Sequence, residues 1–148
     1  MIDENFINFI INLKAESVPK SIQILDPYSN KESVRVTKLF YKKFFNDHNK
    51  RILLFGINPG RLGGGLTGIP FTDPYHLEKS CGISTKLDTK KELSSTFIYE
   101  MIDMYGGPKL FYEKFLVTSI CPYGFTKEGK NLNYYDDKGL ERKWRKKT

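Results

Sequence analysis

Hydrophobic residues along this chain alternate between helical stripes and short continuous runs, and this alternation predicts its elements. Residues 5–15 place large apolar side chains at helical spacing, which predicts a short amphipathic helix. Residues 17–28 follow as an irregular segment interrupted by two prolines. Asn30 then caps a long predicted helix. The buried stripe expected for this helix is Val36, Leu39, Phe40 and Phe44.

Two apolar runs, residues 51–56 and 115–120, are predicted to be buried strands. Two helices are expected between them. The first begins at Ser94 or Ser95, and the second covers residues 108–114 because Pro108 suits a first helical turn. The side chains that the first of these helices is expected to bury are Phe97, Ile98, Met101, Ile102 and Tyr105.

The C-terminal part is mostly polar. Residues 127–133 are predicted to form a loop, and Asp136-Asp137 to cap a last, almost wholly charged helix. Residues 138–148 contain six Lys or Arg and one Glu, with Leu140 and Trp144 as the large apolar residues. We expect a solvated, frayed end here, with a basic tail that contacts DNA phosphates as the alternative.

The order strand, helices, strand, helix is typical of an α/β fold with parallel pairing. With 148 residues, the chain is expected to be one domain over residues 1–148. Two strands do not make a stable doubly wound sheet, because parallel sheets are covered on both faces and usually have several strands. The sequence ends where another strand is expected. We therefore expect a short sheet and a missing C-terminal portion, as in a truncated or frameshifted product.

Composition narrows the class of protein. A hydrophobic content of 39% favours a globular fold, and 24 Lys and Arg against 17 Asp and Glu give a net charge of +7. A net charge of this size is consistent with a polyanionic partner, and equally with a soluble basic protein that has no such partner. Cys81 and Cys121 show no disulfide or metal spacing. No segment resembles a membrane span or a signal peptide. We expect a cytoplasmic protein with reduced thiols and neither a metal nor an organic cofactor.

The most informative stretch is RILLFGINPGRLGGGLTGIPF over residues 51–71. The apolar run stops at Gly56, and Asn58 stands at the mouth of a loop that ends at Phe71 and contains seven Gly or Pro. Loops after the carboxyl ends of strands are where open α/β sheets bind their substrates. The loop lacks the GK[ST] pattern of P-loop nucleotide sites, and the chain lacks the GxSxG of serine hydrolases.

This stretch resembles, without a gap, the first active-site motif of the SMUG-type uracil-DNA glycosylases, in a pattern closest to a bacterial branch. Glu92-Leu93-Ser94, residues 118–122 and Asn131-Leu132 look like later segments of that family. The resemblance runs from about residue 51 to the C-terminus. The matching positions of the first motif are Asn58-Pro59-Gly60, Gly63, Thr67-Gly68 and Pro70-Phe71.

The resemblance implies a three-layer α/β/α fold of the uracil-DNA-glycosylase type, incomplete at its C-terminus. It also implies a monofunctional DNA glycosylase of base excision repair, which removes uracil or another deaminated base from DNA and leaves an abasic site. The implied partner is DNA that is single-stranded or carries a flipped-out base, and we expect a monomer. A catalytically inactive, truncated homologue that only binds DNA is the alternative.

By resemblance, Asn58 holds the attacking water, which an amide can orient but cannot deprotonate. The backbone N–H of Ile57 would reach a base carbonyl, Phe71 would stack on the base, and glycines such as Gly60 let the backbone approach the substrate. Ser119 stands where the family reads the base with an Asn, so a larger deaminated purine such as hypoxanthine or xanthine is an alternative to uracil as the substrate base. The candidate DNA contacts are Arg61, Lys143 and Arg145.

A later His-Pro-Ser motif of the family has no counterpart in this sequence. The two histidines are His48, in a polar helix end, and His76. Asp73-Pro74-Tyr75-His76 resembles the DPYH tetrapeptide of the classical uracil-DNA glycosylases, in which it directly follows the strand. Here it lies on the far side of the loop. We therefore interpret it as a helix-start turn rather than as catalytic residues.

Overall fold

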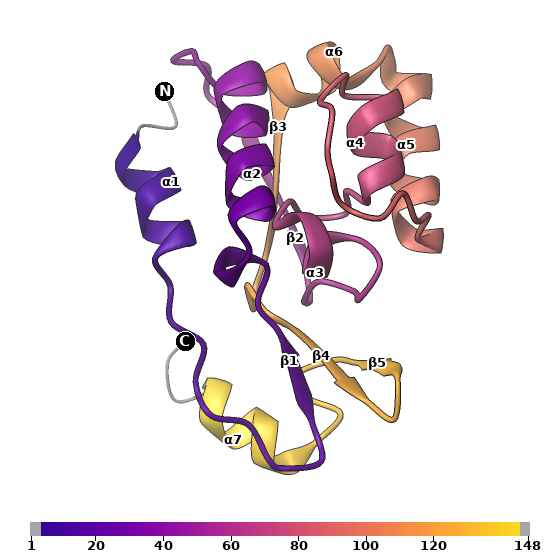
Figure 1. The fold of residues 1–148 in the computed structure, drawn as a ribbon. Helices are drawn as coiled ribbons and strands as arrows, with labels where there is room; N and C mark the ends of the chain where they lie inside the picture. The colour runs from indigo at the N-terminus through magenta and orange to yellow at the C-terminus, as the bar shows by residue number, and fades with distance from the viewer. Residues whose placement is uncertain (1–3, 146–148) are drawn as a thin grey trace.

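Two separate β-sheets organise the chain in the computed structural model, which describes residues 4–145 and side chains as far as Trp144. The parallel pair lies in the upper part of Figure 1 together with α2, α4, α5 and α6, and the antiparallel sheet and α7 form the lower part. The elements are α1 (Glu4–Ile11), β1 (Gln23–Leu25), η1 (Pro27–Ser29), α2 (Lys31–Phe44), β2 (Ile52–Gly56), α3 (Gly64–Thr67), α4 (Pro74–Lys79), α5 (Leu93–Tyr105), α6 (Pro108–Lys114), β3 (Phe115–Ser119), β4 (Gly124–Lys127), β5 (Lys130–Leu132) and α7 (Lys138–Arg145).

The parallel pair confirms the predicted α/β class. β2 and β3 run in register from Ile52 opposite Phe115 to Gly56 opposite Ser119. Between them the chain passes through α3, α4, α5 and α6, as a parallel connection requires. Both strands therefore end at the same edge of the sheet, where the Asn58 loop begins.

The predicted burial of β2 is wrong. Ile52, Leu53 and Phe55 are exposed over 54%, 52% and 62% of their surface. Among the described residues β2 pairs with β3 alone, so its other edge carries no partner strand. An apolar run is typical of a parallel strand that is covered on both faces, and here that cover is missing.

The antiparallel sheet, with strand order β1-β4-β5, corrects two predictions. Residues 17–28 are not wholly irregular, and residues 127–133 are not a plain loop but contain most of the β4–β5 hairpin. The hairpin turns through Glu128 and Gly129, both at positive φ. These strands have only three or four residues, and Gln23 pairs with Thr126, about a hundred residues away in the sequence. Strands this short, paired with residues this distant in the sequence, leave no local hydrophobic pattern from which they could be predicted.

The cap predicted for α2 is confirmed, because the Asn30 side chain accepts hydrogen bonds from the N–H groups of Glu32 and Ser33.

The predicted burial of several residues in α2 and α5 needs correction. Leu39 is exposed although Val36 and Phe40 are buried. In α5 the buried residues are Ser95, Tyr99 and Ile102, whereas Phe97, Met101 and Tyr105, which were predicted to be buried, are exposed. The inward face of α5 is partly polar, which a count of apolar side chains does not detect.

The frayed end predicted for the C-terminal helix is also wrong over its described residues. Asp137 caps α7 by accepting hydrogen bonds from the N–H groups of Gly139 and Leu140. Leu140 is fully buried, and the Trp144 ring packs with its centroid 5.8 Å from that of Tyr123. Helix α7 therefore belongs to the second hydrophobic core.

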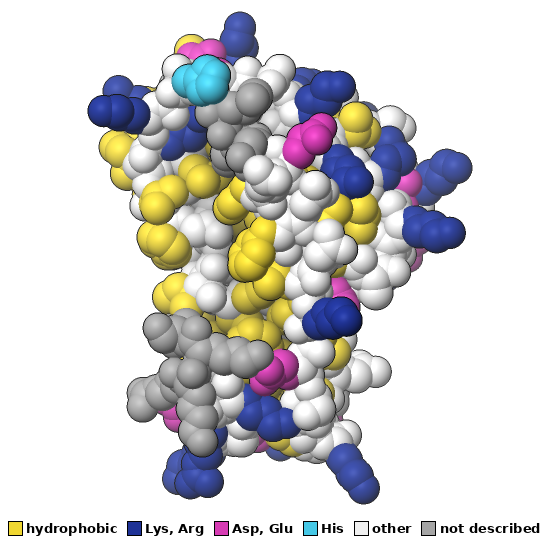
Figure 2. Space-filling view, turned by 90° about the vertical axis from the view of Figure 1, so that its left-hand side faces the viewer, with side chains coloured by type: hydrophobic (Ala, Val, Ile, Leu, Met, Phe, Trp, Pro, Cys, Tyr) yellow, Lys and Arg dark blue, Asp and Glu magenta, His cyan; other side chains and the backbone are white. Residues whose placement is uncertain are grey.

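The molecular surface separates apolar from basic regions on one side. Figure 2 shows hydrophobic side chains gathered over the middle of the face that carries α1, with lysine and arginine side chains toward its upper and lower margins. No helix within residues 4–145 combines the length and the apolar character that crossing a membrane requires.

Candidate active site

A cleft of ≈ 450 Å³ opens where β2 ends, at the place predicted for a substrate site. Its volume is within the range of small-molecule sites. The cleft collects residues from β2, the glycine loop, the start of α5, β5 and the residue that follows β5. The lining residues are Phe55, Gly56, Ile57, Asn58, Pro59, Gly60, Phe71, Glu92, Ser94, Asn131, Leu132 and Asn133.

Asn58 is held in this cleft by the segment that follows the hairpin. Its Nδ2 donates to the carbonyl of Leu132 at 3.1 Å, and its Oδ1 accepts from the N–H of Tyr134 at 3.0 Å. These two bonds fix which end of the carboxamide is oxygen and which is nitrogen. Nδ2 also lies 3.4 Å from the Pro59 carbonyl, whereas the amide oxygen has a second lone pair. The carboxamide is therefore fixed in orientation and still has hydrogen-bonding capacity for a water molecule.

Phe71 lies across the end of β2. A Cβ built on Gly56 would lie 2.6 Å from Cε2 of Phe71, so the ring occupies the space that any larger residue at position 56 would need. Phe71 has φ of 52°, which is unusual for a residue other than glycine. Strained backbone of this kind persists where surrounding structure enforces it, often at functional sites. The half-buried ring thus forms one wall of the cleft.

The glycine loop makes room for a carboxylate that the sequence did not mark as functional. A Cβ built on Gly60 would lie 2.0 Å from Glu92 Oε1, and one on Gly63 would lie 2.0 Å from Oε2. In the sequence, Glu92 was matched only to a later segment of the family, with no functional role. The clue available in the sequence was an acidic residue inside a segment already matched to the family motif. Among the described lining residues, Glu92 is the one ionisable side chain.

The remaining predicted substrate contacts separate into two groups. Ile57 and Gly60 line the cleft, and the Ile57 carbonyl accepts from the N–H of Cys121 at 3.0 Å. Ser119 stands opposite Gly56 in the sheet register but is not among the residues that line the cleft. It lines a neighbouring, mainly apolar cavity of ≈ 330 Å³ between β3 and α1.

Of the three candidate DNA contacts, the structure brings one to the cleft. Arg61 is exposed beside it, and its backbone N–H donates to Asn131 Oδ1 at 3.0 Å. The Lys143 ammonium instead donates to the carbonyl and hydroxyl oxygens of Ser17, which ties α7 to the N-terminal segment. The side chain of Arg145 lies outside the described residues.

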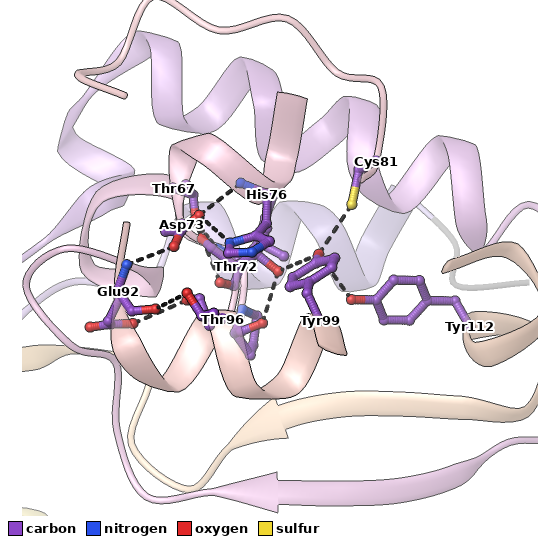
Figure 3. A network of polar contacts seen from close by, with 12 residues as sticks. Thr67, Thr72, Asp73, His76, Cys81, Glu92, Thr96, Tyr99 and Tyr112 are labelled. Atoms are coloured by element: carbon purple, nitrogen blue, oxygen red, sulfur yellow. Dashed lines mark hydrogen bonds and ion pairs between the residues drawn. The ribbon is translucent and has the colours of Figure 1, made fainter. Parts of the chain in front are cut away.

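Asp73 and His76 form a buried structural network rather than a cleft wall (Figure 3). Asp73 Oδ1 accepts from the His76 N–H and is 2.8 Å from His76 Nδ1, and Oδ2 accepts from the Glu92 N–H at 2.7 Å. The His76 ring stacks on Tyr99 with centroids 4.9 Å apart. The Tyr99 hydroxyl is 3.1 Å from the thiol of Cys81, whose pKa burial raises to about 12. The interpretation of Asp73 as a helix-start residue is confirmed, because it caps α4.

No group of three or more metal-binding side chains occurs in the described part of the chain. The two cysteines are free and buried, as expected for reduced thiols. The polar side chains that line the cleft are the amides of Asn58, Asn131 and Asn133, the hydroxyl of Ser94 and the carboxylate of Glu92, next to the ring of Phe71.

Comparison with known proteins identifies the family of the chain. The profile of the Uracil DNA glycosylase superfamily matches residues 42–147, and the chain belongs to that superfamily. Its structure is similar to that of SMUG2 from Pedobacter heparinus, with a TM-score of 0.84 and 44% sequence identity over 92% of this chain. This similarity confirms the SMUG-type resemblance of the glycine loop. The chain spans 62% of the length of that relative. A search of curated proteins finds no match.

Proposed function

We propose that this chain is a monofunctional DNA glycosylase of base excision repair. The proposal is carried by Asn58, whose carboxamide is oriented by two backbone partners at the mouth of a cleft walled by Phe71. Membership of the uracil DNA glycosylase superfamily supports the reaction class. The substrate would be a deaminated base, extruded from DNA into the cleft.

Hydrolysis of an N-glycosidic bond passes through an oxocarbenium-like sugar, so the attacking water needs orientation more than deprotonation. The second lone pair of Asn58 Oδ1 can accept a hydrogen bond from that water and direct its oxygen toward C1′. Phe71 supplies an aromatic face for the extruded base, a contact worth about 1–3 kcal/mol. Backbone N–H groups at the end of β2, such as that of Ile57, would stabilise the departing base as an anion.

In this proposal Ser119 selects the base through the neighbouring cavity that it lines, into which an extruded base would have to extend from the cleft. Its hydroxyl offers one donor and acceptor on a short arm, whereas an Asn pairs with a pyrimidine edge in two places. We expect the Ser119→Asn variant to shift the ratio of excision rates toward uracil and away from xanthine. An unchanged ratio on matched oligonucleotides would remove Ser119 from base selection.

Excision by the 148-residue chain tests the reaction directly. Single-stranded oligonucleotides that carry uracil or xanthine are incubated with the protein, and abasic sites are detected by alkaline cleavage. We expect cleavage by the wild type and nearly none by Asn58→Ala. DNA binding without cleavage by the wild type would favour the alternative of an inactive, DNA-binding homologue. Wild-type rates in Asn58→Ala would refute the role of Asn58.

A further inference from the structure

Glu92 has a position in the cleft that the mechanism above does not use. It is the N-cap residue of α5, yet its side chain makes no capping hydrogen bond to that helix. The carboxylate instead reaches beneath the glycine loop and lines the cleft together with Asn58. The other described lining residues are apolar, amide, hydroxyl or glycine.

The surrounding structure holds this carboxylate in place from several directions. Both carboxylate oxygens lie where the side chains of residues 60 and 63 would be if these residues were not glycines. Ser95 Oγ donates to Glu92 Oε2 at 3.2 Å. The Glu92 N–H is anchored on buried Asp73 at 2.7 Å, and Figure 3 shows the two residues side by side. Glu92 is therefore a preorganised group, which is the property that electrostatic stabilisation of a transition state needs.

The charge of Glu92 is uncompensated within the described chain. The ion pairs of these residues do not include it, although the protein carries a net charge of +7. A half-buried, unpaired carboxylate costs desolvation energy. In a cleft that receives DNA it also repels phosphates. An unpaired carboxylate in the cleft becomes favourable where positive charge develops during the reaction. In the proposed reaction the positive charge develops on the sugar.

On the basis of the proposed glycosylase function, we propose that Glu92 is a second catalytic residue, whose carboxylate stabilises the positive charge on the deoxyribose. The C1′–N bond breaks with both electrons leaving on the base. The water held by Asn58 then donates an oxygen lone pair to C1′ and releases a proton to solvent, and the base anion takes up a proton from solvent. Glu92 forms no covalent bond.

Binding of two abasic-site analogues tests this role without requiring turnover. One oligonucleotide carries a neutral tetrahydrofuran, and the other carries a pyrrolidine whose protonated nitrogen places a positive charge at the position of the sugar. We expect wild type to bind the cationic analogue about tenfold more tightly or better, as for close charge pairs at interfaces. Glu92→Gln should bind both equally. Glu100→Gln, the same change at an exposed site on α5, should keep the preference.

Single-turnover excision supplies the second readout. Glu92→Gln retains the size of the side chain and an acceptor for Ser95, so we expect an unchanged melting temperature. Its excision rate should fall by about 10²-fold, as when one preorganised charge-stabilising group is lost, while affinity for the tetrahydrofuran DNA is unchanged or higher. Should Glu92→Gln not fold, Glu92→Asp keeps the charge on a shorter arm and should show a reduced preference for the cationic analogue.

The outcomes separate the two proposals. If wild type binds neither oligonucleotide, both the proposed function and the role of Glu92 are overturned. If it binds both with equal affinity, the role of Glu92 is wrong and the glycosylase proposal stands. Retention of the preference in Glu92→Gln would likewise overturn the role of Glu92.

Discussion

The Asp73→Asn variant tests whether the DPYH tetrapeptide is structural, as its geometry indicates. The wild-type carboxylate is fully buried and has both oxygens engaged, with Oδ1 on two His76 nitrogens and Oδ2 on the Glu92 N–H. An asparagine offers one acceptor oxygen and an NH₂ group. In one orientation the NH₂ group of the asparagine faces the Glu92 N–H. In the other it faces the backbone N–H of His76, which the wild-type Asp73 caps in the first turn of α4. Either way a buried backbone donor loses its partner.

An unsatisfied buried donor costs about 1–3 kcal/mol. For a chain of this size, each kcal/mol lowers the melting temperature by roughly 2–4 °C. We therefore expect Asp73→Asn to melt about 2–12 °C below wild type, measured by circular dichroism. Asp103→Asn, the same chemical change at an exposed position on α5, is the control and should melt with wild type.

The same variant distinguishes a structural from a catalytic Asp73. Because Asp73 anchors the backbone of Glu92, we expect partial loss of excision that accompanies the loss of stability. Complete loss of excision with a wild-type melting temperature would mean that Asp73 acts in the chemistry. A wild-type melting temperature together with wild-type activity would show that the capping bonds contribute little.

Three further predictions address the two cores and the surface. Leu140→Ala should destabilise the protein by about 2–5 kcal/mol in urea unfolding, because this α7 side chain is fully buried. A change within experimental error would mean that α7 is a frayed end, as its charge suggests. The pKa of Cys81 is raised to about 12 and that of Cys121 to about 11, mainly by burial, so both thiols should resist iodoacetamide at pH 8 until the protein is unfolded. The hydrogen bond from Arg35 lowers the pKa of Glu32 from 4.5 to about 2. The stabilising contribution of the Glu32 carboxylate is therefore present above pH 4.5 and is lost as the pH falls toward 2. Glu32→Gln should narrow the difference in the free energy of unfolding between pH 6 and pH 2, and an equal difference in both proteins would contradict this.

Local chemical signals in the sequence predicted much of the fold. Asn30 marks the start of α2 because its side chain bonds the first N–H groups of the helix, and Pro108 marks α6 because proline suits a first turn. The two apolar runs gave both parallel strands within one residue of their bounds. Their burial could not be predicted in the same way. An apolar run indicates a strand whose two faces are usually packed against other elements. Whether Phe55 is in fact exposed depends on which other strands and helices lie beside it.

The candidate site shows why its remaining parts had no local signal. Asn58 was identified because it ends an apolar run and matches a family motif, but the groups that orient it are a carbonyl and an N–H more than seventy residues away. Every residue except proline has both backbone groups, so neither Leu132 nor Tyr134 is marked by its residue type. Only the pairing of β4 with β1 and β5 brings them to the cleft. A substitution that weakens this hairpin should therefore lower excision by releasing Asn58, even though no hairpin side chain need touch the substrate.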